Sequence, residues 1–392
     1  MRSKLVLFFL LMGHLLLGQQ LGNEWINYDQ SYFKIKTGTD DVHRITYQAL
    51  VDAGFDVSSI SPAQLQLFHR GEEVAIRTVG MDDASFDADD YIEFWGRKND
   101  GTQDTELFYR PQHQIHKFYN MFSDTTAFFL TVGEAQGKRM QVENISPSGL
   151  PSITYHKENI LQVRSEVFSF GQYYPIGNPT GEVKRSYYDV GQMFMSDVIE
   201  KTASTVASGR NKRDFVFDGI TKQLPSVSKP ELTFQIIGFN NIAQHRANTY
   251  VGPSQDGLQP LVQDITLSFN NFGTRENLQL NWDRVSDEGR VVFRVENVGY
   301  DEYPRDLISI GYLRLRYPRE IDAFGTDKFF YIQPDASSRQ ILIPNVPGSP
   351  TLYDVTDYKN PKLIQGQLNA NSYLAGVSGA STEKKLFLKG ES

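Results

Sequence analysis

Residues 230–236 read Pro-Glu-Leu-Thr-Phe-Gln-Ile, so that Leu232, Phe234 and Ile236 occupy every second position. Side chains on a β-strand alternate between its two faces, and this spacing therefore predicts a strand with one apolar face. The same alternation recurs at 265–269, 291–295 and 313–317. Asn270 and Asn271 predict a hairpin after the second of these stretches, because asparagine tolerates the left-handed backbone. Long connections without intervening helices favour a β-sandwich, and among sandwiches a jelly roll.

The chain before this sandwich shows the same pattern in shorter pieces. Alternating stretches at 32–36, 65–67 and 74–76 predict strands, and residues 69–72 join the last two as a hairpin. Two further strands are expected at 91–95 and 126–132. Thr46 is a suitable cap for a short helix over 47–52, which Gly54 would end. Residues 19–132 are therefore expected to form a small N-terminal β domain.

The remaining segments are expected to target or connect these domains. Arg2 and Lys4 precede an apolar run over residues 5–17, and Gly18 follows it, which is the order of a secretory signal peptide over residues 1–18. Residues 133–150 are polar and predict a linker to a sandwich domain at 151–345. Residues 204–213 are small and polar and predict an exposed loop. Residues 346–392 are expected to be connecting strands towards a further domain.

Composition favours the all-β class and excludes several functions. The 392 residues include 26 Phe, 20 Tyr, 3 Trp and 31 Gly, which favours strands and turns with few short helices. A formal net charge of -8 at pH 7, without a basic patch, argues against a nucleic-acid partner. The chain has no cysteine, so it forms no disulfide and offers no cysteine nucleophile. After the signal peptide no segment approaches membrane-spanning length, and we do not expect a transmembrane protein.

Two clusters of polar side chains were candidates for chemistry. Five of the nine residues from Asp82 to Asp90 are aspartates, but the glycine and the closing glutamate of an EF-hand are absent, so a solvated loop is favoured over a calcium site. His113 and His116 are spaced for one face of a helix, but no further ligand lies nearby, and a surface pair is expected. No nucleophile elbow, phosphate loop or dinucleotide fingerprint is present. The sequence therefore predicts no catalytic, cofactor-binding or metal-ligating residue and no cofactor.

Short motifs along the chain, in their order, resemble the N-terminal region of a known family. They lie at residues 32–35, 42–50, 65–68, 71–74, 89–96 and 99–101. Two later stretches, 310–319 and 352–357, resemble the segment that precedes a peptidase domain in the same proteins. The family is that of the PorU-type sortases, gingipain-related cysteine peptidases of the type IX secretion system in Bacteroidetes. The resemblance is weakest over residues 133–225.

The resemblance implies a function in protein secretion. In that family a peptidase domain with a His–Cys dyad lies further towards the C-terminus, removes the C-terminal sorting signal of secreted cargo, and attaches the cargo to lipopolysaccharide at the cell surface. No catalytic residue can be transferred to this cysteine-free chain. The resemblance therefore implies a non-catalytic β-rich region, either part of a longer sortase or a stand-alone relative. It would scaffold the peptidase and contact cargo or outer-membrane components, after export through the periplasm to the outer membrane or cell surface.

A surface carbohydrate-binding protein is the alternative from a different class. A jelly roll could present exposed tyrosines to sugar rings, and the candidates are Tyr173, Tyr174, Tyr187 and Tyr188. Ordinary strand packing is the favoured explanation for these tyrosines. A polysaccharide hydrolase would require a pair of carboxylates that no spacing in the sequence identifies.

Overall fold

The structure is a computed structural model that describes residues 22–57, 60–169 and 187–391. The chain divides into two compact units. Unit 1 comprises Met1–Arg97, Thr126–Met140 and Tyr358–Asn360, and unit 2 comprises Lys98–Thr125, Gln141–Asp357 and Pro361–Ser392. The segment 98–125, which the sequence placed with the N-terminal domain, thus belongs to unit 2. The predicted signal peptide lies outside the described residues, and it stays a prediction.

Unit 1 packs two small antiparallel sheets against each other. The first has the order β1-β7-β3-β4 and the second the order β2-β6-β5. Their inward positions are apolar and fully buried at Leu65, Leu67, Ile92, Phe94 and Phe128, as expected for strands with one apolar face. The strands are β1 (Phe33–Thr37), β2 (Asp41–Thr46), β3 (Leu65–His69), β4 (Glu72–Val74), β5 (Ile76–Val79), β6 (Tyr91–Gly96) and β7 (Thr126–Val132).

The predicted helix and hairpin of unit 1 are confirmed. Helix α2 (Tyr47–Asp52) begins where the Thr46 side chain accepts a hydrogen bond from the backbone N–H of Ala49 at 3.2 Å, and the left-handed Gly54 follows its end. The β3–β4 turn uses Arg70 and Gly71, both with positive φ, as a two-residue hairpin turn requires. Two single-turn 3-10 helices, η2 (Pro62–Gln64) and η3 (Met81–Asp83), lie among the described residues of this unit.

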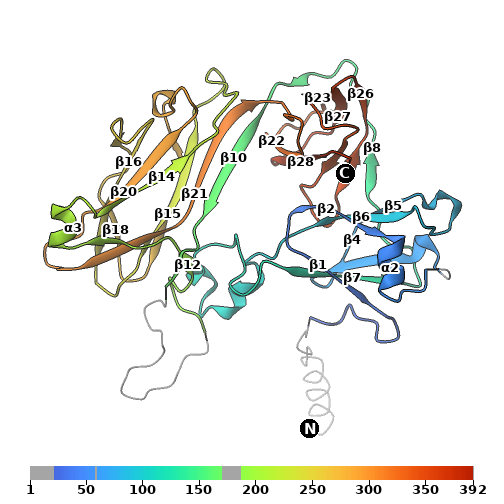
Figure 1. Ribbon diagram of the computed structural model, residues 1–392, viewed down its shortest axis with the longest axis horizontal. Helices are drawn as coiled ribbons and strands as arrows, with labels where there is room; N and C mark the ends of the chain where they lie inside the picture. The colour runs from blue at the N-terminus through green and yellow to red at the C-terminus, as the bar shows by residue number, and fades with distance from the viewer. Residues whose placement is uncertain (1–21, 58–59, 170–186, 392) are drawn as a thin grey trace, which may run out of the picture. The chain divides into compact units, whose positions relative to one another are not determined.

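The larger part of unit 2 is a jelly roll, whose strands pair as a nested set (Figure 1). The first strand pairs with the last (β10 with β21), the second with the second-last (β14 with β20), and then β15 pairs with β19 and β16 with β17 and β18. The chain alternates between the two sheets, β10-β21-β15-β19 and β14-β20-β16-β17. This order is a hairpin ribbon rolled into a sandwich, which confirms the predicted all-β class and jelly roll.

The strands of the jelly roll bury the alternating residues that predicted them. Leu232, Phe234 and Ile236 have no exposed surface, and they pack with Phe293 and Leu313 in one core. The strands are β10 (Tyr155–Val163), β13 (Ile199–Lys201), β14 (Lys212–Phe217), β15 (Glu231–Gly238), β16 (His245–Gly252), β17 (Gln259–Pro260), β18 (Ile265–Leu267), β19 (Phe272–Gln279), β20 (Val291–Asn297) and β21 (Asp306–Glu320).

Two local predictions in this region were wrong. Asn270 and Asn271 do not form a hairpin, because β18 and β19 belong to opposite sheets, and it is Phe269 that takes the left-handed backbone with φ 53. Residues 204–213 are largely exposed but do not form a loop throughout. Helix α3 (Ala203–Ala207) occupies the start of this stretch, capped by reciprocal hydrogen bonds between Thr202 and Thr205, and β14 begins at Lys212.

The C-terminal part of unit 2 contains two more sheets, with the orders β22-β28-β24-β25-β8 and β26-β27-β23-β9. Their shared core includes Phe330, Ile341, Leu352, Leu386 and Leu388. Strand β8 comes from the expected linker 133–150, and strands β24 to β28 come from the expected connecting segment. The bounds are β8 (Gln141–Glu143), β9 (Ser152–Ile153), β22 (Lys328–Ile332), β23 (Arg339–Pro344), β24 (Thr351–Asp354), β25 (Lys362–Ile364), β26 (Gly366–Asn369), β27 (Ser372–Val377) and β28 (Lys384–Lys389).

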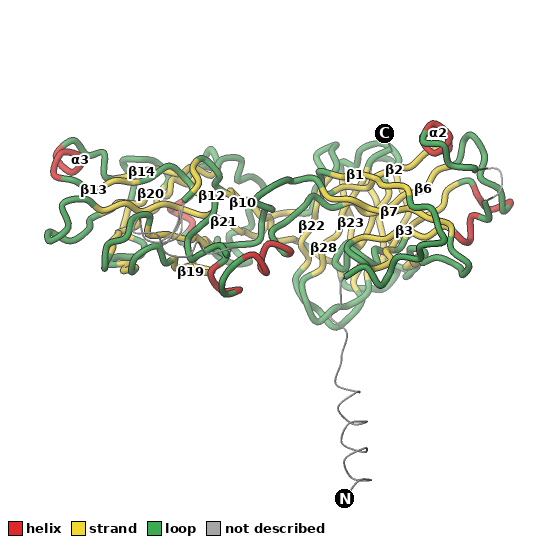
Figure 2. Tube along the Cα trace, turned by 90° about the horizontal axis from the view of Figure 1, so that it is seen from below, coloured by secondary structure: helices red, strands yellow, loops and turns green. Residues whose placement is uncertain are grey.

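Residues 98–125 pack beside the jelly roll with little regular structure. Phe108 and Ile115 are buried there against Met193, Met195 and Ile237. Strands dominate the described residues and helices are short, as Figure 2 shows in yellow and red. None of the helices in the described ranges is long and apolar enough to cross a membrane. The remaining short elements are η4 (Gln103–Leu107), η5 (Pro111–His113), β11 (Val167–Phe168), β12 (Phe194–Met195) and η6 (Trp282–Arg284).

Candidate functional site

The aspartate-rich loop at 82–90 closes on itself through hydrogen bonds. The Ser85 hydroxyl lies within hydrogen-bond distance of the carboxylates of both Asp83 and Asp87, and Asp90 accepts the backbone N–H of Asp87 at 2.7 Å. The backbone and side-chain hydrogen bonds from Ser85 lower the pKa of Asp83. Across the described parts of the chain, no three His, Asp or Glu side chains gather in a way that could hold a metal ion.

The predicted surface pair of histidines was wrong for His116. Residue His113 ends the 3-10 helix η5, so the two imidazoles do not share a helix face. His116 is buried against the rings of Tyr119 and Tyr312, and this burial lowers its pKa to about 4. His113 lies with Nδ1 3.6 Å from Oδ1 of Asp189. This difference could not be predicted from the sequence, because it depends on which strands the segment 98–125 contacts.

Ser378 lies in a buried polar network that the sequence did not predict. Its hydroxyl donates to Oε2 of Glu143 at 2.7 Å and accepts from Nζ of Lys384 at 3.1 Å. Lys384 also donates to Oδ2 of Asp354 at 2.7 Å. A Ser–Lys pair can act as a nucleophile and base only if the lysine is neutral. Burial would raise the pKa of Asp354, but the hydrogen bonds from Lys384 and Thr356 outweigh it and hold that pKa below its ordinary value. This ion pair keeps the lysine charged, so the network is structural.

His245 and Asp306 form a second buried polar pair. His245 Nδ1 lies 2.6 Å from Oδ1 of Asp306, and Nε2 lies 2.7 Å from the carbonyl oxygen of Phe269. Both partners of His245 are acceptors, so both ring nitrogens donate and the ring is an imidazolium. Strands β16 and β21, which carry the pair, belong to opposite sheets. The pair therefore ties the two layers of the jelly roll together and leaves no ring nitrogen for catalysis.

The first candidate surface is a group of exposed rings, which we call the aromatic surface: Tyr109, Phe122 and Tyr187, with Leu107 beside them. The three rings are 54%, 68% and 54% exposed. Backbone hydrogen bonds from Tyr109 to Tyr188 and from Tyr188 to Leu107, at 2.9 and 2.8 Å, fix the two segments together. The rings of Tyr109 and Tyr187 are 6.1 Å apart.

The aromatic surface is held in place from beneath. The buried carboxylate of Asp104 accepts the backbone N–H of Met121 at 2.9 Å and a hydrogen bond from the Asn120 side chain, which positions Phe122. Of the four predicted tyrosines, Tyr187 is exposed, Tyr188 packs on Phe108, and Tyr173 and Tyr174 lie outside the described residues. Tyr109 and Phe122 were missed because no alternating pattern in the sequence marks either ring as exposed. Exposed aromatic groups of this kind commonly mark interaction sites.

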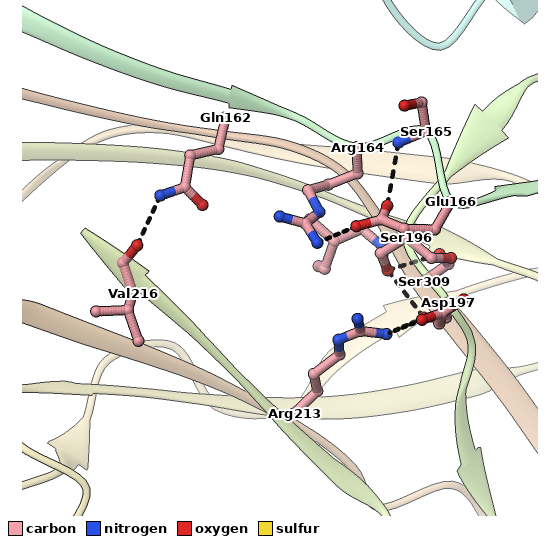
Figure 3. Close-up of polar contacts among 10 residues, drawn as sticks. Gln162, Arg164, Ser165, Glu166, Ser196, Asp197, Arg213, Val216 and Ser309 are labelled. Carbon is pink, nitrogen blue, oxygen red and sulfur yellow. Dashed lines mark hydrogen bonds and ion pairs between the residues drawn. The ribbon is translucent and has the colours of Figure 1, made fainter. Parts of the chain in front are cut away.

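The second candidate surface is the open edge of the jelly roll at β14 (Figure 3). The Gln162 side chain reaches from β10 and donates to the carbonyl oxygen of Val216 at 2.7 Å, which links β10 to the edge strand β14. Nearby, Arg213 pairs with Asp197 at 3.1 Å, and Arg164 pairs with Glu166. A cavity of about 730 Å³ lies at the end of β14. Val216 and Asp218 form one of its walls.

Comparisons with known proteins identify the fold but no sequence family. No protein-family model matches the chain, and no curated protein matches its sequence. Among solved structures, the crystal structure of dimeric latent PorU from Porphyromonas gingivalis matches 92% of this chain with a TM-score of 0.55 and 12% identity. The match covers 32% of the PorU chain, so this chain spans about a third of that protein's length. At this identity the likeness shows a PorU-like fold.

Two other structures match with little agreement. The VP2 subviral particle of infectious bursal disease virus aligns with 96% of this chain and 84% of its own, at 8% identity and a TM-score of 0.22. The ANX1 ectodomain from Arabidopsis thaliana aligns with 74% of this chain and 82% of its own, at 9% identity and a TM-score of 0.17. Superpositions this poor carry no argument about this protein.

Proposed function

We propose that this chain is the non-catalytic, β-rich region of a PorU-type sortase of the type IX secretion system. In this role it would be exported by the signal peptide over residues 1–18 and act at the outer membrane or cell surface. There it would scaffold the peptidase. It would also contact secreted cargo with C-terminal sorting domains or outer-membrane components of the secretion system.

The observation that carries this proposal is the extent of the likeness to PorU. The aligned region covers 92% of the chain and so includes strands of both compact units and all three pairs of packed sheets. Jelly rolls and small sandwiches are common separately, but a shared succession of them along one chain is more specific than any one of them. The ordered motifs in the sequence point to the same family independently of the coordinates.

A contact role fits what the described surface offers. The chain has no cysteine, so a thiolate nucleophile would have to come from another segment or another chain. The hydroxyl of Ser378 and both ring nitrogens of His245 are engaged in hydrogen bonds within the protein. The aromatic surface, in contrast, has three exposed rings on an ordered support, and aromatic side chains are enriched where proteins meet partners.

Residues 19–392, purified alone, should bind a cargo sorting domain without cleaving it. Binding can be measured by biolayer interferometry and cleavage by mass spectrometry. The triple variant Tyr109→Ser, Phe122→Ser, Tyr187→Ser should weaken binding about tenfold or more, because buried aromatic anchors dominate interface energies.

The control variant is Val142→Ser, Leu342→Ser, which removes two equally exposed apolar side chains, 59% and 54% exposed, from the C-terminal sheets. It should leave binding unchanged. Cleavage of the sorting domain by this chain would contradict the non-catalytic role. Absence of binding, or an equal loss in both variants, would contradict the contact role.

Carbohydrate binding is the second candidate, and the ring pair Tyr109 and Tyr187 is the observation that favours it. Both rings are half exposed and neighbours, and the Arg110 guanidinium lies 5.6 Å from the Tyr109 ring centre. Sugar faces stack on such rings while their hydroxyls meet nearby polar groups. A glycan array decides between the two functions: specific saccharide binding that Tyr187→Ala abolishes would support this candidate over cargo contact.

A further inference from the structure

Strand β14 leaves one row of its backbone groups without a neighbouring strand. It pairs only with β20 among the described strands. The backbone N–H of Asn297 on β20 donates to the carbonyl of Asn211, so Asn211 and every second residue after it face β20. The backbone groups of Lys212, Asp214 and Val216 therefore point to the open edge. Within the described residues, the amide of Gln162 donates the one hydrogen bond to this row, at the Val216 carbonyl. Such a row is a template for another strand.

The side chains of the same three residues lie on the outer face of the sheet, because Phe215 and Phe217 between and beyond them point into the core. On that face Asp214 forms a two-fold ion pair with Arg294, at 2.6 and 2.7 Å, and accepts from Gln255 at 2.8 Å. Val216 is 38% exposed beside the cavity of about 730 Å³. A strand added to β14 would thus set alternate side chains directly over this cavity.

The cavity has a definite chemical character. The described residues that line it include three carboxylates, those of Asp218, Asp256 and Glu288, and one guanidinium, that of Arg290, so negative charge is in excess. Ser254, Ser286 and Gln255 add polar groups. Arg290 is already held by Asp218 at 2.7 Å. Among the residues that the structure describes, no aromatic ring lines the cavity, which disfavours a stacked sugar. At the other end of the edge stands the exposed cation Lys212.

We propose that the β14 edge binds an extended segment of a partner polypeptide as an additional strand, with a lysine or arginine side chain of that segment in the cavity. Main-chain hydrogen bonds to Lys212, Asp214 and Val216 supply the affinity, and the guest strand replaces the Gln162 amide at the Val216 carbonyl. The acidic cavity supplies the preference for a basic residue. A second copy of the chain is a poorer occupant, because six residues of edge bury far less than the roughly 800 Å² per partner of a stable dimer.

The site is a property of the jelly roll, so it holds whether or not the chain works beside a sortase peptidase. Its test uses residues 19–392 and fluorescent ten-residue peptides that alternate threonine and valine around one central lysine. Matched peptides carry glutamate in place of lysine, or N-methyl groups on alternate amides. The lysine peptide should bind saturably, and both matched peptides about tenfold or more weakly, by fluorescence anisotropy.

Two variants separate the backbone from the cavity. Val216→Pro removes an N–H that faces the open edge and keeps the hydrogen bonds to β20. It should therefore weaken the binding of every peptide, whereas Val216→Thr should not. Asp256→Asn with Glu288→Gln should weaken the lysine peptide about tenfold or more and leave a peptide with threonine at the centre unchanged. The control Asp301→Asn with Glu302→Gln makes the same change of net charge at other exposed acids.

Several results would overturn the proposal. These are no saturable binding, equal binding of the lysine and glutamate peptides, and equal binding of the N-methylated peptide. An equal loss of lysine-peptide binding in the cavity double variant and in the control double variant would also overturn it. Sedimentation velocity on the peptide-free chain tests whether a second copy of the chain occupies the edge. Self-association that Val216→Pro abolishes and Val216→Thr does not abolish would assign the edge to a second copy. If Val216→Pro does not fold, the surface double variant and the N-methylated peptide still decide the matter.

Discussion

Two histidines of unit 2 are equally buried and are used in opposite ways. His245 and His156 are 1% and 0% exposed. Both ring nitrogens of His245 face acceptors, the Asp306 carboxylate and the Phe269 carbonyl. Neither ring nitrogen of His156 has a hydrogen-bond partner in the described structure, and its ring packs edge-on against Phe330. His245 is charged and links two sheets, whereas His156 is neutral and packs in the core, because a buried charge needs partners.

The surroundings of His156 explain why it stays neutral. Burial lowers its pKa to about 3, and although Glu158 would favour the charged form, Lys328, Arg319 and Arg316 oppose it. Glu158 is engaged elsewhere: it accepts from Lys328 at 2.8 Å and pairs with Arg319. These ion pairs join the jelly-roll strands β10 and β21 to β22 of the C-terminal sheets. A histidine can therefore be buried either with hydrogen-bond partners or in its neutral form. Removal of a partner should destabilise the first kind, and acid should destabilise the second.

The largest expected effect comes from removing a partner in the paired case. Asp306→Ala leaves the imidazolium of His245 buried without its counter-charge, and we expect a loss of about 3–5 kcal/mol in the free energy of unfolding. Urea denaturation followed by tryptophan fluorescence measures it. The control Asp264→Asn removes the charge of an exposed pair with Arg246, keeps a residue suited to the left-handed backbone at this position (φ 56), and should leave the urea midpoint unchanged. A small loss for Asp306→Ala would show that His245 is neutral, like His156.

The unpaired histidine should instead respond to acid. The pKa of an unfolded histidine is near 6.5 and that of folded His156 is about 3. Between these values the unfolded chain binds a proton that the folded chain does not bind. Stability is therefore complete above pH 6.5 and falls as the pH drops towards 3. The free energy of unfolding of the wild-type chain should fall between pH 7 and pH 5, and His156→Leu should remove about 2 kcal/mol of that fall, at about 1.4 kcal/mol per pKa unit.

This pH range isolates the histidine from its carboxylate neighbour. Burial would raise the pKa of Glu158, but Lys328 and Arg319 outweigh it and lower that pKa, so the stability Glu158 contributes is lost only below its ordinary value of 4.5. His116→Leu should show the same behaviour, since burial lowers the pKa of His116 to about 4. Urea midpoints at pH 7, 6 and 5 make the measurement. An unchanged pH dependence in His156→Leu would mean that this ring has a partner and belongs with His245.

Local pattern predicted the strands, but not these buried polar groups. Leu232, Phe234 and Ile236 identify a strand because their alternation is a property of neighbouring residues. His245 and Asp306, in contrast, meet only because β16 and β21 face each other across a jelly roll. The same holds for the candidate sites: Tyr187 was predicted as an exposed aromatic, while the open edge at Val216 depends on which strand stands beside β14.

The smallest loss of stability is expected at Ser378, because the groups that its hydroxyl contacts have other hydrogen-bond partners. Ser378→Ala removes the hydroxyl between Glu143 and Lys384, but Glu143 keeps the backbone N–H of residue 378 at 2.7 Å and Lys384 keeps Asp354 at 2.7 Å. We therefore expect a loss of about 1–2 kcal/mol in the free energy of unfolding. The control Ser146→Ala changes an exposed hydroxyl and should have no effect on the urea midpoint. A loss as large as that of Asp306→Ala would mean that the network fails as a unit, so that its members are no more replaceable than the single carboxylate beside His245.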